Sequence, residues 1–193
     1  MIDLPKIILA SGSPRRSEIM NSVGWSFTKA VPDIDESERA GESPDDYVCR
    51  LAVEKAQAVA GSHPGEIVLA ADTTVVIDGQ IMGKPVDDRD ARRMIRMLAG
   101  NWHEVLTGVA VSKNGASEVG MQRTRVKFAA MNEAEIEFLV EKGDPLDKAG
   151  AYAVQAQAAL FIEGIEGDYW NVVGLPISLV YRLVIKAGQS IGI

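Results

Sequence analysis

Residues 11–16, with the sequence SGSPRR, have the composition of a phosphate-binding segment. They follow an apolar run and precede a helical pattern, which places Ser13 at the N-cap position and Pro14 in the first turn. The free backbone N–H groups of a helix start attract anions, and the forked guanidinium groups of Arg15 and Arg16 suit phosphate oxygens. Taken alone, the segment fits two interpretations equally well: a phosphate site, or a capped surface helix with two solvated arginines.

Two acidic and two basic residues further along the chain extend this chemistry. Asp72 interrupts two apolar, β-prone runs, and burying a carboxylate without a partner is costly. Lys55 lies on or beside the apolar stripe of a helix, where it either extends its ammonium group to water or reaches an anion. Glu36 belongs to an acidic run that is otherwise typical of a solvated loop. Lys84 follows a glycine, but the proline after it and the missing upstream glycine exclude a P-loop.

Any catalytic metal of this chain should have oxygen ligands. Two histidines and one cysteine cannot assemble the usual His/Cys zinc site. Magnesium or manganese is therefore expected, held by Glu36, Asp72 and substrate phosphates. Three cations, Arg15, Lys55 and Lys84, would suit the negative charge of a polyphosphate. Together these residues indicate phosphoanhydride chemistry, without choosing the bond or the base.

Composition narrows the class of protein. The chain has 193 residues, 47% of them apolar, which is enough for a sizeable core. Its net charge of -7 opposes broad attraction to nucleic acid or to an anionic membrane. It has no run of eighteen apolar residues and no N-terminal signal-peptide pattern, so a cytoplasmic protein with no membrane partner is expected. The single cysteine, Cys49, excludes an internal disulfide framework.

Apolar periodicity and turn signals predict the elements that would position these side chains. The expected fold is α/β, with a mixed central sheet flanked by helices, and residues 1–193 form one unit of two lobes sharing a cleft. Ser13, Asp72 and Lys84 are each expected at or just past a strand end, the edge where α/β sheets bind ligands. The predicted strands are 6–10, 25–31, 67–71 resuming at 75–77, 80–82, 104–112, 117–128 and 160–165; the predicted helices are 14–23, 44–60, 88–99, 132–142 and one from 176.

Eight segments, taken in order, are similar to the motifs of one protein family. On this ordered set the chain resembles the Maf family of nucleoside triphosphate pyrophosphatases, and the resemblance covers residues 6 to about 185. It implies a fold of the Maf and inosine triphosphatase type. The matching segments are 10–16, 35–36, 51–56, 71–75, 83–85, 107–109, 147–152 and 171–176.

The resemblance implies metal-dependent hydrolysis of a nucleoside triphosphate between its α- and β-phosphates, giving a monophosphate and pyrophosphate. Asp72 matches the position assigned as proton acceptor, and an ionised carboxylate there would orient or deprotonate a water molecule. Glu36 and Lys84 complete the expected catalytic set, with Glu36 as a metal ligand beside Asp72. The expected substrate contacts are Arg15, Thr73 and Gln155 for selection, and Ser13, Arg16, Lys55 and Lys84 for the triphosphate.

Within the family, Lys148 with Tyr152 and Gln155 resembles the branch that acts on dTTP and UTP. A glutamine amide offers both a donor and an acceptor, which match the edge of uracil or thymine. The chain departs from this branch at Ala156, where glycine is usual, so other modified or purine triphosphates remain an alternative. A non-enzymatic role in septum formation is a second alternative. A homodimer, which is common in the family, is the expected assembly.

Overall fold

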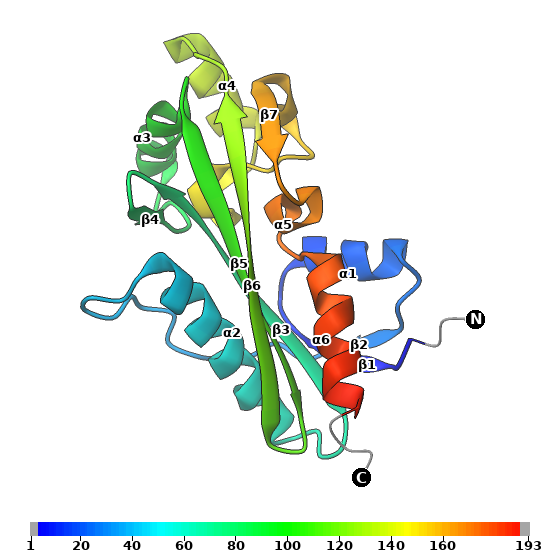
Figure 1. Cartoon of the computed structure of the whole chain (residues 1–193). Helices are drawn as coiled ribbons and strands as arrows, with labels where there is room; N and C mark the ends of the chain where they lie inside the picture. Colours follow the sequence, from blue (N-terminus) through cyan, green and yellow to red (C-terminus); the bar gives the residue numbers. More distant parts are fainter. Residues whose placement is uncertain (1–3, 190–193) are drawn as a thin grey trace. The chain divides into compact units, whose positions relative to one another are not determined.

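The computed structural model describes residues 4–189, so the first three and last four residues of the expected 1–193 unit lie outside it. Within the described range, a seven-stranded sheet has the order β2-β1-β3-β5-β6-β7, with β4 paired to β3. Strand β1 runs parallel to β2 and β3, whereas β4 is antiparallel to β3 and β7 is antiparallel to β6. Helices flank the strands, which confirms the expected mixed α/β class (Figure 1).

The strands are β1 (Ile7–Ala10), β2 (Phe27–Lys29), β3 (Ile67–Ile77), β4 (Gln80–Met82), β5 (Trp102–Lys113), β6 (Ala116–Phe128) and β7 (Ile162–Glu166). The α-helices are α1 (Pro14–Ser22), α2 (Pro44–Ala60), α3 (Asp88–Leu98), α4 (Glu133–Lys142), α5 (Tyr169–Val173) and α6 (Ile177–Gln189). Three short 3₁₀ helices are η1 (Pro145–Asp147), η2 (Ala149–Ala151) and η3 (Gln157–Leu160). Among residues 4–189, no helix is both long and apolar enough to cross a bilayer.

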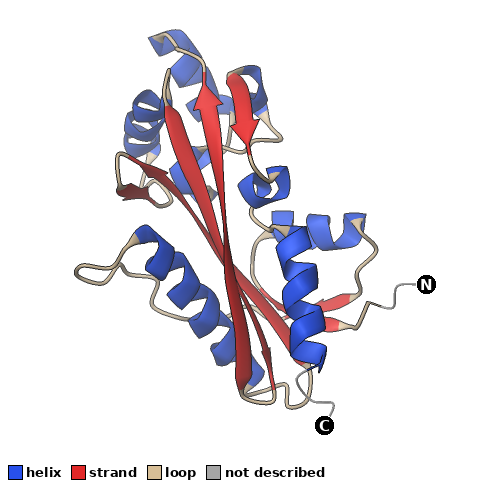
Figure 2. Ribbon diagram, viewed as in Figure 1, coloured by secondary structure: helices blue, strands red, loops and turns tan. Residues whose placement is uncertain are grey.

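Asp72 does not lie at a strand end, which corrects the expectation from the sequence. Strand β3 continues without a break through Asp72 to Ile77 (Figure 2). The pairing of β1 with β3 ends at Ala10 and Ala70, and from Val75 to Ile77 β3 pairs with β4 instead. Asp72 thus lies in the middle of β3, just beyond the level at which the neighbouring strand β1 ends. Ser13 and Lys84 do follow the ends of β1 and β4, as expected.

Local signals placed most helices correctly, and the exceptions are short elements. Ser43 caps α2 by accepting from the backbone N–H of Asp46, and Asn132 forms a capping box with Glu135 at the start of α4. The strand predicted at 25–31 shortens to Phe27–Lys29. The three 3₁₀ helices and α5 were not predicted, because each is at most five residues long and too brief for a periodic pattern.

The chain forms two compact units. Unit 1 comprises residues up to Asp72, Thr107–Gln122 and the residues from Gly174 on. Unit 2 comprises Thr73–Leu106 and Arg123–Val173. Three strands, β3, β5 and β6, contribute residues to both units, so neither unit corresponds to a continuous stretch of sequence.

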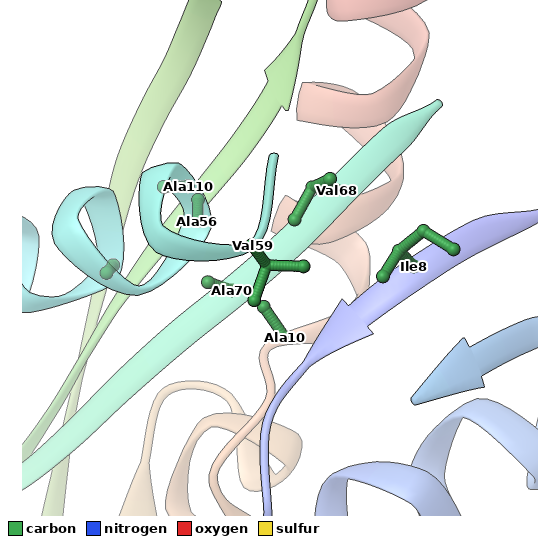
Figure 3. Close-up of a cluster of buried hydrophobic side chains, with 8 residues drawn as sticks. Ile8, Ala10, Ala56, Val59, Val68, Ala70 and Ala110 are labelled. Carbon is green, nitrogen blue, oxygen red and sulfur yellow. The ribbon is translucent and has the colours of Figure 1, made fainter. Parts of the chain in front are cut away.

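The core of unit 1 lies between α2 and the sheet. Alternate residues of the strands point toward α2, because successive side chains of a strand face opposite sides. Figure 3 shows Val59 of α2 beside Ala70 of β3, with Ile8 and Ala10 of β1 in the same cluster. The alanines let the helix approach the sheet closely. The full cluster is Ile8, Ala10, Ala52, Ala56, Val59, Val68, Ala70 and Ala110.

In unit 2, α3 and α4 lie against each other. Helix α3 buries an apolar face made of Ala91, Met94, Ile95 and Leu98. Two arginines of α3 form ion pairs with α4: Arg92 with Glu137 at 2.5 Å, and Arg96 with Glu133 at 2.5 Å.

Candidate active site

Asp72 of β3 and Lys55 of α2 form a buried ion pair in unit 1. Lys55 Nζ donates to Asp72 Oδ1 at 2.6 Å, and the two residues are only 8% and 7% exposed. Lys55 therefore does not extend its ammonium group to water, which was one of the two interpretations of its place on the apolar stripe. The contact explains how a carboxylate can be buried inside an apolar strand, because the ammonium group of Lys55 compensates its charge.

The close approach of α2 to the sheet makes this pair possible. At Gly108 in the unit 1 part of β5, a Cβ atom would lie 2.2 Å from the carbonyl oxygen of Val48 in α2. Real Cβ atoms do not approach backbone that closely, so only glycine fits at this contact. Gly108 thus fixes the distance at which α2 presents Lys55 to β3. It belongs to the Thr107–Val109 segment of the family resemblance, which the sequence did not connect to Lys55.

Glu36 joins the pair from the loop between β2 and α2. Its Oε1 lies 3.0 Å from Lys55 Nζ, so one ammonium group contacts two carboxylates. The Glu36 side chain is half exposed, whereas the Asp72 side chain is buried. Tyr47 of α2 donates its hydroxyl to the Glu36 carbonyl at 3.1 Å and so holds the loop. We call Glu36, Lys55 and Asp72 the carboxylate–lysine group.

Arg16 is held beside the carboxylate–lysine group by contacts that its motif did not predict. Its Nε donates to the Gly174 carbonyl at 2.9 Å, and its Nη1 donates to Ser11 Oγ at 3.1 Å. Ser11 Oγ also accepts from the backbone N–H of Ser13 at 3.2 Å. Ser13 occupies the N-cap position, but its side chain makes no capping hydrogen bond, contrary to expectation. Ser11 is the hydroxyl that organises this turn.

The charges of Asp72 and Glu36 affect the pKa values of both Arg16 and Tyr47. Burial lowers the pKa of the Arg16 guanidinium, and the negative charges of Asp72 and Glu36 act in the opposite direction. Arg15 is close enough for its positive charge to lower the pKa of Arg16 further. Burial, followed by the charges of Asp72 and Glu36, raises the pKa of Tyr47 to about 12. Tyr47 therefore stays protonated as a donor, a site role that the sequence pattern did not indicate.

The remaining predicted residues belong to unit 2. Thr73 is partly buried in β3, and Lys84 is exposed in the loop after β4. The carbonyl of the neighbouring Gly83 accepts from the backbone N–H of Gly150 at 3.1 Å. Gln155 is exposed in the turn that follows Tyr152. The structure thus gathers Arg16, Glu36, Lys55 and Asp72 in unit 1; in unit 2 it joins the Lys84 loop to the turn that contains Gly150.

The carboxylate–lysine group has a donor set that fits a hard divalent cation. No three His, Cys, Asp or Glu side chains of the described residues form a group that could hold a metal on their own. Magnesium, however, is often bound through only one or two carboxylates, with substrate phosphates and water as the other ligands. Glu36 and Asp72 supply such a pair of carboxylates, both within reach of one ammonium group. The residues therefore fit the metal expected from the sequence.

Comparison with known proteins places the whole chain in one family. The profile of the Maf family, described as Maf-like protein, matches residues 6–187. The chain is 46% identical over 188 residues to the dTTP/UTP pyrophosphatase of Symbiobacterium thermophilum, with 97% of each chain covered. It is 49% identical over 189 residues to the dTTP/UTP pyrophosphatase of Anaeromyxobacter dehalogenans strain 2CP-C, with 95% of each covered.

A solved structure supports the fold. The Ham1 protein of Staphylococcus aureus aligns with a TM-score of 0.54 and 15% identity, covering 96% of this chain and 100% of that one. At this identity the likeness concerns the architecture alone, and it agrees with the mixed sheet described above. The family match over residues 6–187 and the near full-length relatives carry the assignment: this chain belongs to the Maf family.

Proposed function

We propose that this Maf protein is a nucleoside triphosphate pyrophosphatase that hydrolyses dTTP and UTP to the monophosphate and pyrophosphate. The observation that carries the proposal is the buried Asp72 carboxylate, held at 2.6 Å by Lys55 beside Glu36. The relatives in Symbiobacterium and Anaeromyxobacter are named for this activity, and they match nearly the full length of the chain.

The proposed reaction is attack of water on the α-phosphorus. A bond forms between the water oxygen and the α-phosphorus, and the bond from that phosphorus to the bridging oxygen of pyrophosphate breaks. Asp72 accepts the proton of the water, for which its carboxylate must be ionised. Lys55 stabilises that ionised form before the reaction, because its ammonium group already contacts Asp72 Oδ1.

The cations of the site are proposed to bind the triphosphate. Charge on phosphate oxygens is dispersed, so fixed positive groups contribute mainly by position and electrostatics. Arg16 is held in place by Gly174 and Ser11, so its guanidinium needs little rearrangement to meet an anion. Arg15 and Lys84 are proposed as further phosphate contacts, and Ser13 offers the helix start of α1.

We further propose that Glu36 and Asp72 hold a divalent cation, magnesium or manganese. When bound, the cation would neutralise triphosphate charge and lower the pKa of a coordinated water molecule. The half-exposed Glu36 can adjust to the cation, because it lies on a loop, whereas Asp72 is fixed in β3. Removal of divalent cations by EDTA should abolish turnover, and added magnesium or manganese should restore it.

For base recognition we propose Gln155, with Thr73 as a second contact. The Gln155 amide can donate to a carbonyl of uracil or thymine and accept from its N3–H group. Ala156 adds a methyl group beside it, so the choice of base is the part of the proposal that most needs measurement. The test is a panel of dTTP, UTP, CTP, GTP and ATP, with pyrophosphate and orthophosphate measured separately.

The panel separates the alternatives. Fastest release of pyrophosphate from dTTP and UTP is the expected result. Fastest release from a purine nucleotide would assign the chain to purine or modified nucleotides instead. Orthophosphate as the product would overturn the bond assignment, and no turnover of any nucleotide would favour a non-enzymatic role.

A further inference from the structure

The segment of unit 2 that contains Gln155 begins with a strained turn. Gly150 has φ of +68° and Ala151 has φ of +66°, so two successive residues adopt the left-handed conformation. For alanine this conformation is unfavourable, because the Cβ atom crowds the following carbonyl oxygen. Ala151 is nevertheless buried and not glycine. Such strain persists only where the surroundings fix the backbone, and it is common where a site must be held in shape.

One side of the turn is fixed by close contact with its neighbours. The Gly150 N–H donates to the Gly83 carbonyl, and a Cβ at Gly150 would lie 2.7 Å from Val75 Cγ2. The Ala151 N–H donates to the Lys148 carbonyl at 3.0 Å. Lys148 is itself buried and forms an ion pair with Asp147 at 2.5 Å. These contacts hold the backbone up to Ala151.

The other side of the turn is fixed through one large side chain. Tyr152 Oη lies 2.7 Å from Nε2 of His103, a residue of β5. The rings of Tyr152, His103 and Phe128 are packed edge to face, with centroids 5.4 Å apart for Tyr152 and His103 and 4.9 Å for Tyr152 and Phe128. We call these three residues the aromatic group. Because His103 and Phe128 lie on adjacent strands, they give Tyr152 a rigid base.

Burying His103 at this position destabilises the fold unless its hydrogen bond to Tyr152 compensates. His103 is 2% exposed, and its Nδ1 has no hydrogen-bond partner among the described residues. A buried polar nitrogen without a hydrogen-bond partner destabilises the folded state, because it loses its contact with water. Burial also lowers the pKa of His103 to about 4, so the ring is neutral and gains no ion pair. A phenylalanine would avoid the unpaired Nδ1 but would leave the buried Tyr152 hydroxyl without this partner, so the hydrogen bond, rather than packing alone, accounts for His103.

Tyr152 is a large, buried side chain at the start of the turn that contains Gln155. Between Tyr152 and η3 the backbone makes a tight turn, in which the Ala156 N–H donates to the Ala153 carbonyl at 3.1 Å. Gln155 lies within this turn and is exposed, whereas Val154 is buried. Most other residues of the segment are alanines, which bury little area each. A displacement of Tyr152 would therefore carry Gln155 with it.

We infer that His103 is a positioning residue for base recognition, acting through the Tyr152 hydroxyl on the turn that presents Gln155. The inference rests on the proposed function, because it concerns the base contact of that same site. His103 itself touches neither the base nor the phosphates. It fixes where the Gln155 amide lies, and so sets how sharply one base is preferred over another.

The test compares four single variants of the full-length protein. Tyr152→Phe removes only the hydroxyl. His103→Asn and His103→Gln both replace the imidazole with a neutral amide, but only the longer glutamine places that amide near the original Nε2 position. Tyr169→Phe is the matched control, since it removes a tyrosine hydroxyl from an exposed position on α5.

The readout is the ratio of kcat/KM between the best and the worst nucleotide of the panel. Loss of one hydrogen bond worth about 1 kcal/mol corresponds to roughly a fivefold change. We expect the ratio to fall about fivefold in Tyr152→Phe and in His103→Asn, mainly through a higher KM for the preferred nucleotide. His103→Gln should retain most of the ratio, and Tyr169→Phe should retain all of it. The double variant Tyr152→Phe, His103→Asn should be no worse than either single variant.

Thermal unfolding and circular dichroism show whether each variant is folded, and Tyr152→Phe is mild enough to keep the test valid if His103→Asn is not. A wild-type ratio in folded Tyr152→Phe and His103→Asn would overturn the inference. Equal losses in His103→Asn and His103→Gln would do the same, because they would mean a packing role. A preference for purines would overturn the proposed substrate while leaving this ratio measurable, whereas no turnover at all would overturn both.

Discussion

The two units bury polar side chains in opposite ways. In unit 1, the carboxylate–lysine group buries two formal charges against each other, Lys55 and Asp72, with Glu36 at the edge. In unit 2, the aromatic group buries a neutral histidine against a tyrosine hydroxyl, and burial raises the pKa of Tyr152 as it lowers that of His103. Both arrangements centre on one short hydrogen bond, 2.6 Å in the first and 2.7 Å in the second.

The difference follows from what each region has to do. A group that accepts a proton must be ionised in advance, which requires a compensating charge next to it. A group that only fixes a backbone is better neutral, because a neutral pair costs less to desolvate. The pairing with Lys55 therefore agrees with the proposed role of Asp72 as proton acceptor. The neutral pair of His103 and Tyr152 instead fixes the backbone of unit 2 at Tyr152.

The largest expected effect tests the charged region. Asp72→Asn keeps the size of the side chain but removes the proton acceptor, so kcat should fall by roughly 10²–10⁴-fold. Pyrophosphate release from the best nucleotide measures the loss. Asp78→Asn is the matched control, because Asp78 is exposed in the β3–β4 turn, where asparagine also accepts its positive φ. Activity in Asp72→Asn equal to that of the control would remove Asp72 from the chemical role.

The stability of the charged region depends on which partner is removed. Lys55→Met leaves Asp72 buried without a counter-charge, and breaking a buried pair in this way costs about 3–5 kcal/mol. Asp72→Asn should cost less, since Lys55 keeps its contact with Glu36. Urea unfolding of the two variants measures the difference. Equal losses of unfolding free energy would mean that the pair is compensated by solvent rather than by each other.

The neutral region is expected to depend on backbone shape. Gly150→Ala combines the left-handed conformation with a contact to Val75, and the strain and overpacking together should cost about 3 kcal/mol. Gly79→Ala is the matched control, because Gly79 has φ of +75° but nothing within 4 Å of a Cβ. It should cost about 1–2 kcal/mol for the conformation alone. Thermal unfolding compares them, and a similar loss in both would show that Val75 yields easily.

The buried histidine predicts a pH dependence of stability. The folded protein keeps His103 neutral down to a pKa of about 4, whereas the unfolded chain takes up the proton near 6.5. The unfolded state therefore binds more protons between these values, and the contribution of His103 to stability falls as the pH drops through this window. Between about pH 7 and pH 5 the loss is about 2 kcal/mol. This loss of stability should be absent in His103→Gln, as measured by urea unfolding at several pH values. A stability profile of the variant identical to that of the wild type would contradict the prediction.

The smallest expected effect is that of an exposed charge pair. Arg96 of α3 and Glu133 of α4 lie 2.5 Å apart, but both side chains are more than half exposed. Arg96→Gln should leave the thermal midpoint without a resolvable change, and raising the salt concentration should not distinguish it from the wild type. A clear loss of stability would mean that an exposed ion pair stabilises this protein as a buried pair does.

Several site residues could be found from the sequence because their signals are local. Asp72 was recognisable as an acid within an apolar strand, and Lys55 as a lysine on an apolar helical stripe. The helices predicted at 44–60 and 132–142 likewise agree with α2 and α4 to within one residue. The sequence did not single out Ser11, Tyr47 or His103. Their roles consist of contacts with distant residues, and no spacing in the sequence encodes those contacts.

The sequence by itself determined the elements, their order and the family, because periodicity, caps and motifs act over a few residues. Only the tertiary structure decided the partners. Lys55 meets Asp72 across 17 positions, His103 meets Tyr152 across 49, and Arg16 meets Gly174 across 158. Such contacts depend on strand register and on how closely helices approach strands. For the same reason, the sequence of β3 alone could not predict that its pairing with β1 ends at Ala70, two residues before Asp72.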